Sequence, residues 1–256
     1  MIFLFDRLSY NIANAQEIIR KGGYRAFLNE ALRRKPFYGQ LLVPFAARKL
    51  KSLQRERSSG SLKETIDFSF GFSYLGINMR PVQVRSEITK LLEILKKRKP
   101  KSILEIGTAN GGTLFLFAKV SDRNARIVSI DNGYPRWREK LYRAFALPSQ
   151  KLYLLRSNSH DSSTLKRARG LLGGARVDFL FIDGDHTYEG VKKDFAMYSK
   201  LVKKGGVIGF HDIVVHPPEA ECEVDRLFNE VKKRYRSSEI VENRKQGWGG
   251  IGVLYT

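Results

Sequence analysis

The sequence predicts an α/β protein built on a doubly wound, mostly parallel sheet, and two observations lead to this prediction. Between residues 102 and 235, short apolar runs that suit buried strands alternate with longer stretches of helical periodicity. That order favours a parallel sheet with helices on both faces. The alternation then ends, because the last two apolar runs, residues 239–241 and 250–255, leave no room for a helix between them and should pair antiparallel.

The expected elements follow one another in regular order. Residues 68–79, which contain aromatic side chains and glycine, are interpreted as a loop over the core, and residues 81–97 as a helix because Val84, Ile88, Leu91 and Leu95 recur on one side. After this helix we expect strands at 102–107, 126–131, 151–156, 177–183 and 207–212, and helices at 113–120, 136–146, 163–172, 188–202 and 220–235. The two final strands complete a seven-stranded sheet whose last strand runs antiparallel.

Residues 1–60 form a basic, helical N-terminal region with twelve Lys and Arg against four acids. Short helices are expected at 11–20, 24–34 and 38–55, and Ser58-Ser59-Gly60-Ser61 resembles a linker, so we predict an N-terminal extension at 1–60 and a main domain at 61–256. The third helix has an apolar stripe made of Tyr38, Leu41, Leu42, Phe45, Leu50 and Leu53. Such a stripe packs on a core or lies on an anionic membrane surface.

Charge is the unusual feature of the composition. The 256 residues carry a formal net charge of +20, which favours an anionic partner such as nucleic acid, acidic lipid or acidic glycan, unless the charge only keeps the protein soluble. The single cysteine, Cys222, excludes an internal disulfide framework and a zinc site of several cysteines. No apolar run reaches the ~20 residues of a membrane span, and the one at the N-terminus stops at Asp6. We expect a cytoplasmic protein, with peripheral contact at the inner membrane face as an alternative.

A glycine-rich turn follows the first strand of the alternating region. Gly107, Gly111 and Gly112 let the backbone approach a ligand, and the helix after them offers free N–H groups. Their spacing is not the G-x-G-x-x-G of dinucleotide sites. Glu105, at the end of the strand, would repel a pyrophosphate but suits a ligand with an amine or a sulfonium. The alternative is an ordinary strand–turn–helix without a ligand.

Polar residues also follow the second and third strands. Asp131 and Asn132 stand 24 and 25 residues after Gly107, where an acid can accept both ribose hydroxyls of a nucleoside. The alternative for Asp131 is a turn or helix-capping residue. The third strand is followed by Ser157, Asn158, Ser159, His160 and Asp161, of which the last two could be the N-cap of the next helix.

The fourth and fifth strands end in carboxylates and imidazoles. Asp183 and His186 follow the fourth strand, and His211 and Asp212 end the fifth, which should be its neighbour. These four side chains suit a general base or a divalent metal ion. The alternative is a hydrogen-bonded turn that caps the next helix through Thr187. His216 is interpreted as incidental and Trp248 as a hairpin packing residue.

The segment from Leu104-Glu105-Ile106-Gly107 to Gly112 resembles the first motif of class I S-adenosylmethionine-dependent methyltransferases, which have a Rossmann-like fold. The resemblance extends from about residue 88 to residue 256, and residues 183–213 resemble small-molecule O-methyltransferases related to the catechol and macrolide-sugar enzymes. In the family the region after the third strand borders the adenine. The resemblance implies cofactor binding by Glu105, Gly107, Thr108, Gly111, Gly112, Asp131, Asn132, Ser157, Asn158 and Asp183.

Some members of this subgroup bind Mg²⁺ at positions that fall on Asp183, His211 and Asp212 in this sequence. His211 departs from the carboxylate that is usual there, so metal dependence is left open. The resemblance implies O-methylation of a hydroxyl on a sugar, a glycolipid or another small molecule, with Asp183, His186 and His211 as catalytic residues. Two alternatives are an RNA methyltransferase and a non-catalytic adaptor whose basic N-terminal region binds anionic membrane or nucleic acid. A homo-oligomer also stays open.

Overall fold

The computed structural model describes residues 36–56 and 60–256, with side chains in the first range from residue 38 onward. The described residues group into two compact units. The first contains residues 36–56, Phe72–Met79 and Pro135–Ala144, and the second contains residues 60–71, Arg80–Tyr134 and Phe145–Thr256. The helices expected at 11–20 and 24–34 lie outside the described residues, and the domain boundary at residue 60 stays a prediction. Among the helices that are described, none is long and apolar enough to cross a membrane.

Helix α2, Pro36–Glu56, is the main element of the first unit, and it confirms the helix expected at 38–55. Its buried side consists of Val43, Ala46, Ala47 and Leu50. Of the expected apolar stripe, Leu50 is fully buried, whereas Tyr38, Leu41 and Phe45 are exposed, so the stripe as a whole does not pack on the core. Pro44 lies inside the helix without ending it. The helix therefore presents one apolar side to the protein and a second to solvent.

Two short segments complete the first unit. One is the hairpin of β1, Ser73–Tyr74, and β2, Ile77–Asn78. The other contains the 3₁₀ turn η1, Arg136–Arg138, and the short helix α6, Glu139–Arg143, where a helix at 136–146 was expected. Arg138 donates to the carbonyl oxygen of Asn78 at 3.0 Å, and Gln54 donates to that of Ala144 at 2.9 Å. These bonds join the three segments of the unit.

The second unit contains the expected seven-stranded sheet, in the order β5-β4-β3-β6-β7-β9-β8. Its strands are β3 Ser102–Ile106, β4 Arg126–Ile130, β5 Lys151–Leu155, β6 Val177–Ile182, β7 Val202–His211, β8 Arg236–Ile240 and β9 Ile251–Tyr255. The first five pair parallel, and β9 runs antiparallel between β7 and β8. The predicted doubly wound sheet with an antiparallel last strand is confirmed. Because β3 has β4 on one side and β6 on the other, the strand order reverses direction there, which is where such sheets bind ligands.

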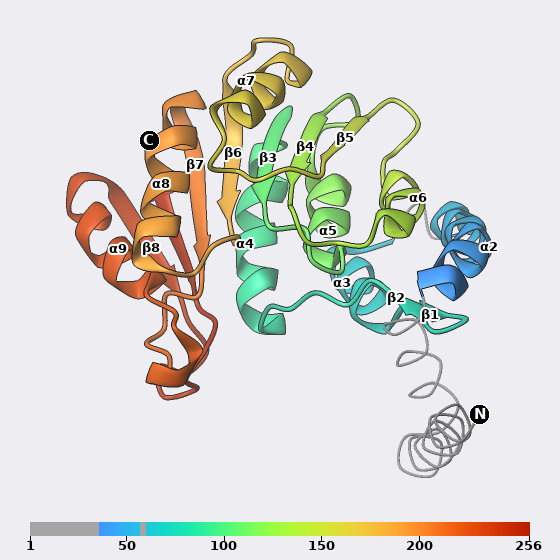
Figure 1. The fold of residues 1–256 in the computed structure, drawn as a ribbon, viewed down its shortest axis with the longest axis horizontal. Coiled ribbons are helices and arrows are strands. Elements are labelled where there is room, and N and C mark those ends of the chain that lie inside the picture. The colour runs from blue at the N-terminus through green and yellow to red at the C-terminus, as the bar shows by residue number, and fades with distance from the viewer. Residues whose placement is uncertain (1–35, 57–59) are drawn as a thin grey trace, which may run out of the picture. The chain divides into compact units, whose positions relative to one another are not determined.

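Helices cover both faces of this sheet (Figure 1). Helices α3 Leu62–Gly71, α4 Arg85–Arg98 and α5 Gly112–Val120 lie together on one face, and α7 Ser162–Leu171, α8 Tyr188–Tyr198 and α9 Val224–Val231 cover the other. Helix α3 and the hairpin replace the loop expected at 68–79. Three expected helices are shorter than predicted. Helix α4 begins at Arg85 rather than at 81, α8 gives way to a 3₁₀ turn at Ser199, and α9 is shortened at both ends.

Alternate residues of each buried strand point to opposite faces of the sheet. Leu104 and Ile106 of β3 pack in the apolar cluster that contains residues of α7, α8 and α9. Glu105, between them, therefore points to the face covered by α4 and α5. Its neighbour in register on β4 is Ser129, which points the same way.

Candidate active site

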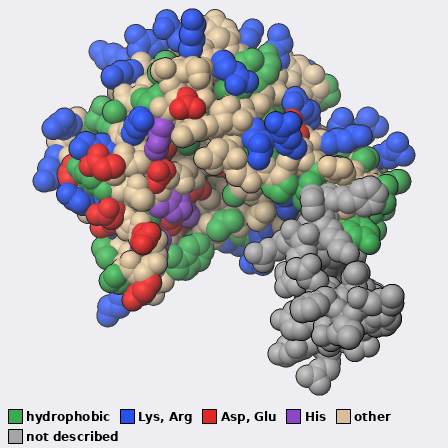
Figure 2. Space-filling view, viewed as in Figure 1, with side chains coloured by type: hydrophobic (Ala, Val, Ile, Leu, Met, Phe, Trp, Pro, Cys, Tyr) green, Lys and Arg blue, Asp and Glu red, His purple; other side chains and the backbone are tan. Residues whose placement is uncertain are grey.

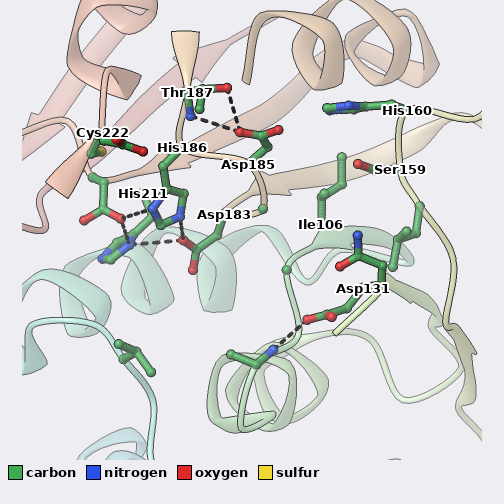
Figure 3. A pocket seen from close by; sticks show the side chains of 18 of the residues that line it. Ile106, Asp131, Ser159, His160, Asp183, Asp185, His186, Thr187, His211 and Cys222 are labelled. Carbon is green, nitrogen blue, oxygen red and sulfur yellow. Dashed lines mark hydrogen bonds and ion pairs between the residues drawn. The ribbon is translucent and has the colours of Figure 1, made fainter. Parts of the chain in front are cut away.

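A cavity of about 880 Å³ lies where β3, β4, β5, β6 and β7 end. Its wall includes Gly107, Asp131, Asn132, Ser157, Asn158 and Asp183, which are six of the ten residues expected at a cofactor. It also includes His186, His211 and Asp212. Figure 3 shows Asp183, His186 and His211 turned toward one another, with Asp131 and His160 away from them on the other side. The two groups of residues singled out in the sequence therefore share one cavity.

Gly107 is required where β3 and β6 end side by side. Its φ is +94°, in the left-handed region that glycine tolerates best, and a Cβ there would overlap the backbone carbonyl of Asp183. Gly111, also at positive φ, is the residue from which α5 begins. The other four residues expected at a cofactor, Glu105, Thr108, Gly111 and Gly112, are not part of the cavity wall. The turn thus shapes the cavity mainly through its backbone.

The carboxylate of Asp131 organises the turn beside it. One oxygen accepts from the backbone amides of Thr108 at 2.8 Å and Ala109 at 3.0 Å. The other accepts from those of Gly133 at 2.6 Å and Tyr134 at 3.2 Å. Asp131 is therefore a turn-forming residue and a residue of the cavity wall at the same time, so the two interpretations of it are compatible.

Glu105 lies behind the wall of the cavity. It is fully buried, and its Oε2 accepts a hydrogen bond from Ser129 Oγ at 2.5 Å. Ser129 in turn lies 2.6 Å from the hydroxyl of Thr108. Burial raises the pKa of Glu105 to about 8, more than the hydrogen bond from Ser129 lowers it. A carboxyl group with this pKa is mostly protonated at neutral pH, which removes the negative charge that suggested an amine or sulfonium partner.

Asp183, His186, His211 and Asp212 meet at the ends of β6 and β7, as expected. Nδ1 of His211 lies 3.2 Å from Asp183 Oδ1 and 3.1 Å from Asp212 Oδ2. The ring nitrogens of His186 lie 3.5 Å from Asp183 and 3.6 Å from Asp212. Thr187 also caps α8, accepting from the amide of Gly190 at 3.1 Å. The capping interpretation is thus correct for Thr187, yet it does not account for the four charged side chains.

The electrostatics of this cluster hold His211 as a cation when no metal is present. Burial by itself lowers the pKa of His211, but the carboxylates of Asp183 and Asp212 outweigh it and raise the pKa to about 10. Burial likewise raises the pKa of both aspartates, and the imidazoles hold each pKa below its usual range. His186 is half-exposed, and its pKa is raised mainly by Asp183.

Asp212 has a strained backbone. Its φ is +63°, which few residues other than glycine adopt, although aspartate tolerates it better than most. Its Oδ1 accepts from the amide of Gly249 at 2.9 Å, and the amide of Val214 donates to the carbonyl of Gly249 at the same distance. These bonds hold Asp212 in a conformation that directs its carboxylate at His211.

Four residues of the site were not predicted, or were given another role. Gln83, which precedes α4, donates to Asp183 Oδ2 at 2.9 Å. His216 was interpreted as incidental, but its Nε2 lies 3.1 Å from Asp212 Oδ1 and it lines the cavity. Trp248 was assigned to hairpin packing, and the structure places it half-exposed in the cavity wall. Cys222 lines the cavity too. For His216, the only local sign in the sequence of a contact with Asp212 was its position four residues after that aspartate.

The donor set fits a divalent cation. One ligand atom from each of Asp183, His211 and Asp212 lies within 4.8 Å of the other two, and the same holds for His186, Asp212 and Cys222. Two carboxylates and an imidazole are ligands that Mg²⁺, Mn²⁺ or Zn²⁺ accepts, although imidazole favours the transition metals. Because a bound ion needs His211 neutral, it competes with the proton that the two carboxylates otherwise hold there.

His160 occupies the opposite part of the cavity wall. Asp161 is the N-cap residue of α7, but no side-chain hydrogen bond caps that helix. Nε2 of His160 lies 3.5 Å from Oδ1 of Asp194, a fully buried residue of α8. Burial raises the pKa of Asp194 more than His160 and Ser159 lower it. His160 is thus a cavity residue rather than only a cap.

The strand order, the antiparallel β9 and the cavity at the carboxyl ends define the class I methyltransferase fold. Residues 104–213 match the family model described as a methyltransferase domain. A curated relative, an uncharacterised protein of Acanthamoeba polyphaga mimivirus, is 34% identical over 113 residues, which are 43% of this chain and 50% of that protein. The chain therefore spans about half the length of this relative.

Solved structures of O-methyltransferases share the fold. TomG from Streptomyces achromogenes, involved in tomaymycin synthesis and solved with S-adenosylmethionine, is 18% identical and aligns over 82% of this chain and 89% of its own with a TM-score of 0.51. A putative caffeoyl-CoA O-methyltransferase from Staphylococcus aureus is 19% identical over 82% and 99%, with a TM-score of 0.53. The resemblance to class I S-adenosylmethionine-dependent methyltransferases is confirmed for the domain and its fold.

Proposed function

We propose that this protein transfers a methyl group from S-adenosylmethionine to a hydroxyl group of a small molecule, with sugars and glycolipids among the candidate acceptors. One observation carries the proposal. A single cavity takes in both the turn held by Asp131 and the cluster around His211. Methyl transfer needs donor and acceptor within a near-attack distance of each other, and a shared cavity meets that need.

The two parts of the cavity would have different roles, one binding the methyl donor and the other the acceptor. Asp131, Asn132, Ser157 and Asn158 offer polar groups to a nucleoside, and His160 stands beside them. Asp183, His186 and His211 line the part that would receive the acceptor. In the reaction the sulfur–methyl bond breaks as the oxygen–methyl bond forms, and the acceptor proton passes to a base. No covalent bond to the protein is required.

His186 is the better placed of the two histidines to accept that proton directly. It is half-exposed in the cavity wall, whereas His211 is buried and held as a cation by its two carboxylates. If a divalent ion is bound, Asp183, His211 and Asp212 would hold it. The ion would lower the pKa of the acceptor hydroxyl, and Asp183 and Asp212 would serve as ligands.

Calorimetry of the purified protein with S-adenosylmethionine and with NAD tests the first half of the proposal. We expect binding of the former alone. Incubation with methyl-labelled S-adenosylmethionine and extracted glycans and lipids tests the second half, because transfer of label identifies the acceptor class. Absence of S-adenosylmethionine binding would show the proposal to be wrong, and binding without transfer to any extract would favour the non-catalytic adaptor.

A further inference from the structure

The edge of the sheet opposite the cavity, where the parallel strands begin, carries a concentration of positive charge. Fourteen exposed Lys and Arg side chains lie on the turns and element ends of this edge, which we call the basic edge. They are Lys96, Lys97, Arg98, Lys99, Lys101, Arg123, Lys151, Arg176, Lys200, Lys203, Lys204, Lys233, Arg234 and Arg236. Figure 2 shows Lys and Arg gathered along the side where the strands begin, with acids and histidines toward the other end.

Hydrogen bonds between the turns show that these residues share one edge. Arg98 donates to the carbonyl of Gly205 at 2.9 Å, and Arg176 donates to that of Lys200 at 3.2 Å. The backbone amide of Arg126 donates to Lys101, and that of Lys151 donates to Ala125. The segments before β3, β4, β5, β6 and β7 are therefore linked into one continuous surface.

Little on this edge neutralises the charge. Within the described part of the chain, Lys203 is the single member of the basic edge with an ion pair, to Asp178 at 2.5 Å. The carboxylate of Asp178 also accepts hydrogen bonds from the amides of Lys101 and Ser102, so little of its negative charge is left to neutralise other lysines of the edge. Helix dipoles explain only part of the pattern. Lys96, Lys97 and Arg98 lie in the last turn of α4, where cations are favoured, but Lys101, Lys151 and Lys204 lie at strand starts.

The side chains favour a lipid surface over nucleic acid. Nine of the fourteen are lysines, which act as point charges without the planar fork that arginine offers to bases and phosphates. Single-stranded nucleic acid binds by stacking on exposed aromatic rings. None of the large exposed hydrophobic side chains among the described residues belongs to this edge. The ring of Tyr255 is flanked by Arg98 at 5.5 Å and Arg236 at 4.6 Å, so cations already occupy it.

We propose that the basic edge binds the surface of a membrane that contains acidic phospholipids. The attachment of this edge is electrostatic, because the edge has, among its described residues, no large exposed apolar side chain to insert, so its binding depends on lipid charge and weakens with salt. Attachment by this edge leaves the cavity, at the opposite ends of the strands, open to the aqueous side. An acceptor in solution would then reach the cavity more easily than a lipid of the same membrane. This inference goes beyond the proposed methyl transfer and does not depend on it.

Two matched triple variants of the full chain test the proposal. Lys101→Glu, Lys151→Glu and Lys204→Glu reverse charges across the basic edge. Lys90→Glu, Lys193→Glu and Lys245→Glu change the net charge equally at exposed positions elsewhere in the second unit. Binding is measured by co-sedimentation with vesicles of phosphatidylcholine alone, or of phosphatidylcholine with phosphatidylserine, in about 0.1 M salt. Circular dichroism and thermal melting confirm that both variants fold.

We expect the wild-type chain to bind only the vesicles with phosphatidylserine, and more salt to release it. The edge variant should bind them at least about tenfold more weakly, and the control variant should stay within about threefold of wild type. The proposal is wrong if the wild-type chain does not bind these vesicles, or if the two variants lose affinity equally. It is also wrong if the edge variant loses binding to a duplex RNA while its vesicle binding is unchanged.

Discussion

Nδ1 of His211 lies 3.2 Å from Oδ1 of Asp183, and this contact joins the ends of two neighbouring strands, β7 and β6. The same nitrogen lies 3.1 Å from Asp212. An imidazole nitrogen between two carboxylates holds a cation, which is a proton in the absence of metal and a divalent ion in its presence. The chemistry of the cavity therefore depends on which of the two is bound.

Removing either partner of this contact should reduce turnover. In Asp183→Ala and His211→Ala we expect labelled methyl transfer to fall by ~10²–10⁴-fold, the usual worth of a general base or its equivalent. In His211→Ala the affinity for S-adenosylmethionine, measured by calorimetry, should change little, because His211 lies away from the Asp131 side of the cavity. Full activity in both variants would show that the cluster only stabilises the turn.

Chelation by EDTA distinguishes a mechanism with a bound divalent ion from one in which the cluster holds only a proton. If a divalent ion is bound at Asp183, His211 and Asp212, EDTA should abolish activity and Mg²⁺ or Mn²⁺ should restore it. If EDTA has no effect, His186 is the base, and the rate should fall as the pH decreases through the pKa of His186, which lies above the usual ~6.5. A rate independent of both EDTA and pH would contradict both mechanisms.

The protonated form of His211 should make stability depend on alkaline pH. A histidine whose pKa is higher in the folded state stabilises the fold fully below ~6.5, the pKa of the unfolded state, and loses this contribution as the pH rises through about 10. In EDTA, we expect the free energy of unfolding to fall between pH 8 and about 10 in the wild-type protein and less in His211→Gln. Urea titrations at several pH values measure the difference. Parallel curves for the two proteins would mean that His211 is neutral in the folded state.

Asp131 should contribute to cofactor affinity. Asp131→Ala removes a carboxylate that organises four backbone amides and faces the cavity. Charge-assisted hydrogen bonds contribute about 1.5–3 kcal/mol each, so the dissociation constant for S-adenosylmethionine should rise at least about tenfold. Glu189→Ala, which removes an exposed carboxylate outside the cavity wall, is the matched control, with an expected change below about threefold. An unchanged constant in Asp131→Ala would leave Asp131 as a turn residue only.

Much of this architecture could be predicted because the strands are short, apolar and buried. The polar residues that end them must then meet at one edge, which is how Asp183, His211 and Asp212 were found together. The roles of His216 and Trp248 could not be predicted, because each reaches the cavity wall through a loop whose path is set by tertiary contacts such as the bond between Asp212 and Gly249. The contact of Gln83 with Asp183 could not be predicted either, because it depends on the path of the segment before α4.

The direction of Glu105 could have been deduced from strand alternation, but the sequence did not show which face holds the cavity. Helix α3 was missed because the aromatic and glycine residues from 68 onward suggested a loop, although the helix begins at Leu62. The exposed side of α2 was misjudged for a related reason. A helix with apolar residues on two sides has no single stripe that its spacing alone can assign to the core.

The two sides of α2 should differ in their effect on stability. Leu50 is completely buried and Leu41 is 54% exposed. Leu50→Ala should therefore lower the free energy of unfolding by about 2–5 kcal/mol, and Leu41→Ala by about 0.5 kcal/mol or less. Urea unfolding measures both. Equal losses would mean that the exposed side is covered in solution.

The exposed side of α2 is also where the basic N-terminal region could touch a membrane. Leu41→Glu with Phe45→Glu replaces two exposed apolar side chains by acids. If residues 1–60 insert this side into a bilayer, the double variant should float less with anionic liposomes than wild type at every salt concentration, because insertion is an apolar contribution. Unchanged flotation would show that this region makes no apolar contact with the bilayer.

The buried carboxyl group of Glu105 should make the stability of the protein depend on pH. Because burial raises its pKa to about 8, the folded state holds a proton that the unfolded chain releases near pH 4.5. Stability should therefore fall as the pH rises from about 4.5 through about 8. Glu105→Gln keeps the shape and can still accept from Ser129, but it cannot ionise. We expect it to match wild type at pH 5 and to be more stable at pH 9, by an amount on the order of a few kcal/mol.

The same variant should bind S-adenosylmethionine within about threefold of wild type, because Glu105 is no part of the cavity wall and is mostly protonated at neutral pH. Calorimetry at pH 7 measures this, and Ser129→Ala, which removes the hydrogen-bond donor, serves as the companion variant. A loss of tenfold or more in Glu105→Gln with unchanged melting would mean that an ionised Glu105 attracts the positive charge of the donor. In that case ligand binding would lower the pKa of Glu105, and the affinity of the wild-type protein would rise between pH 6 and about 9.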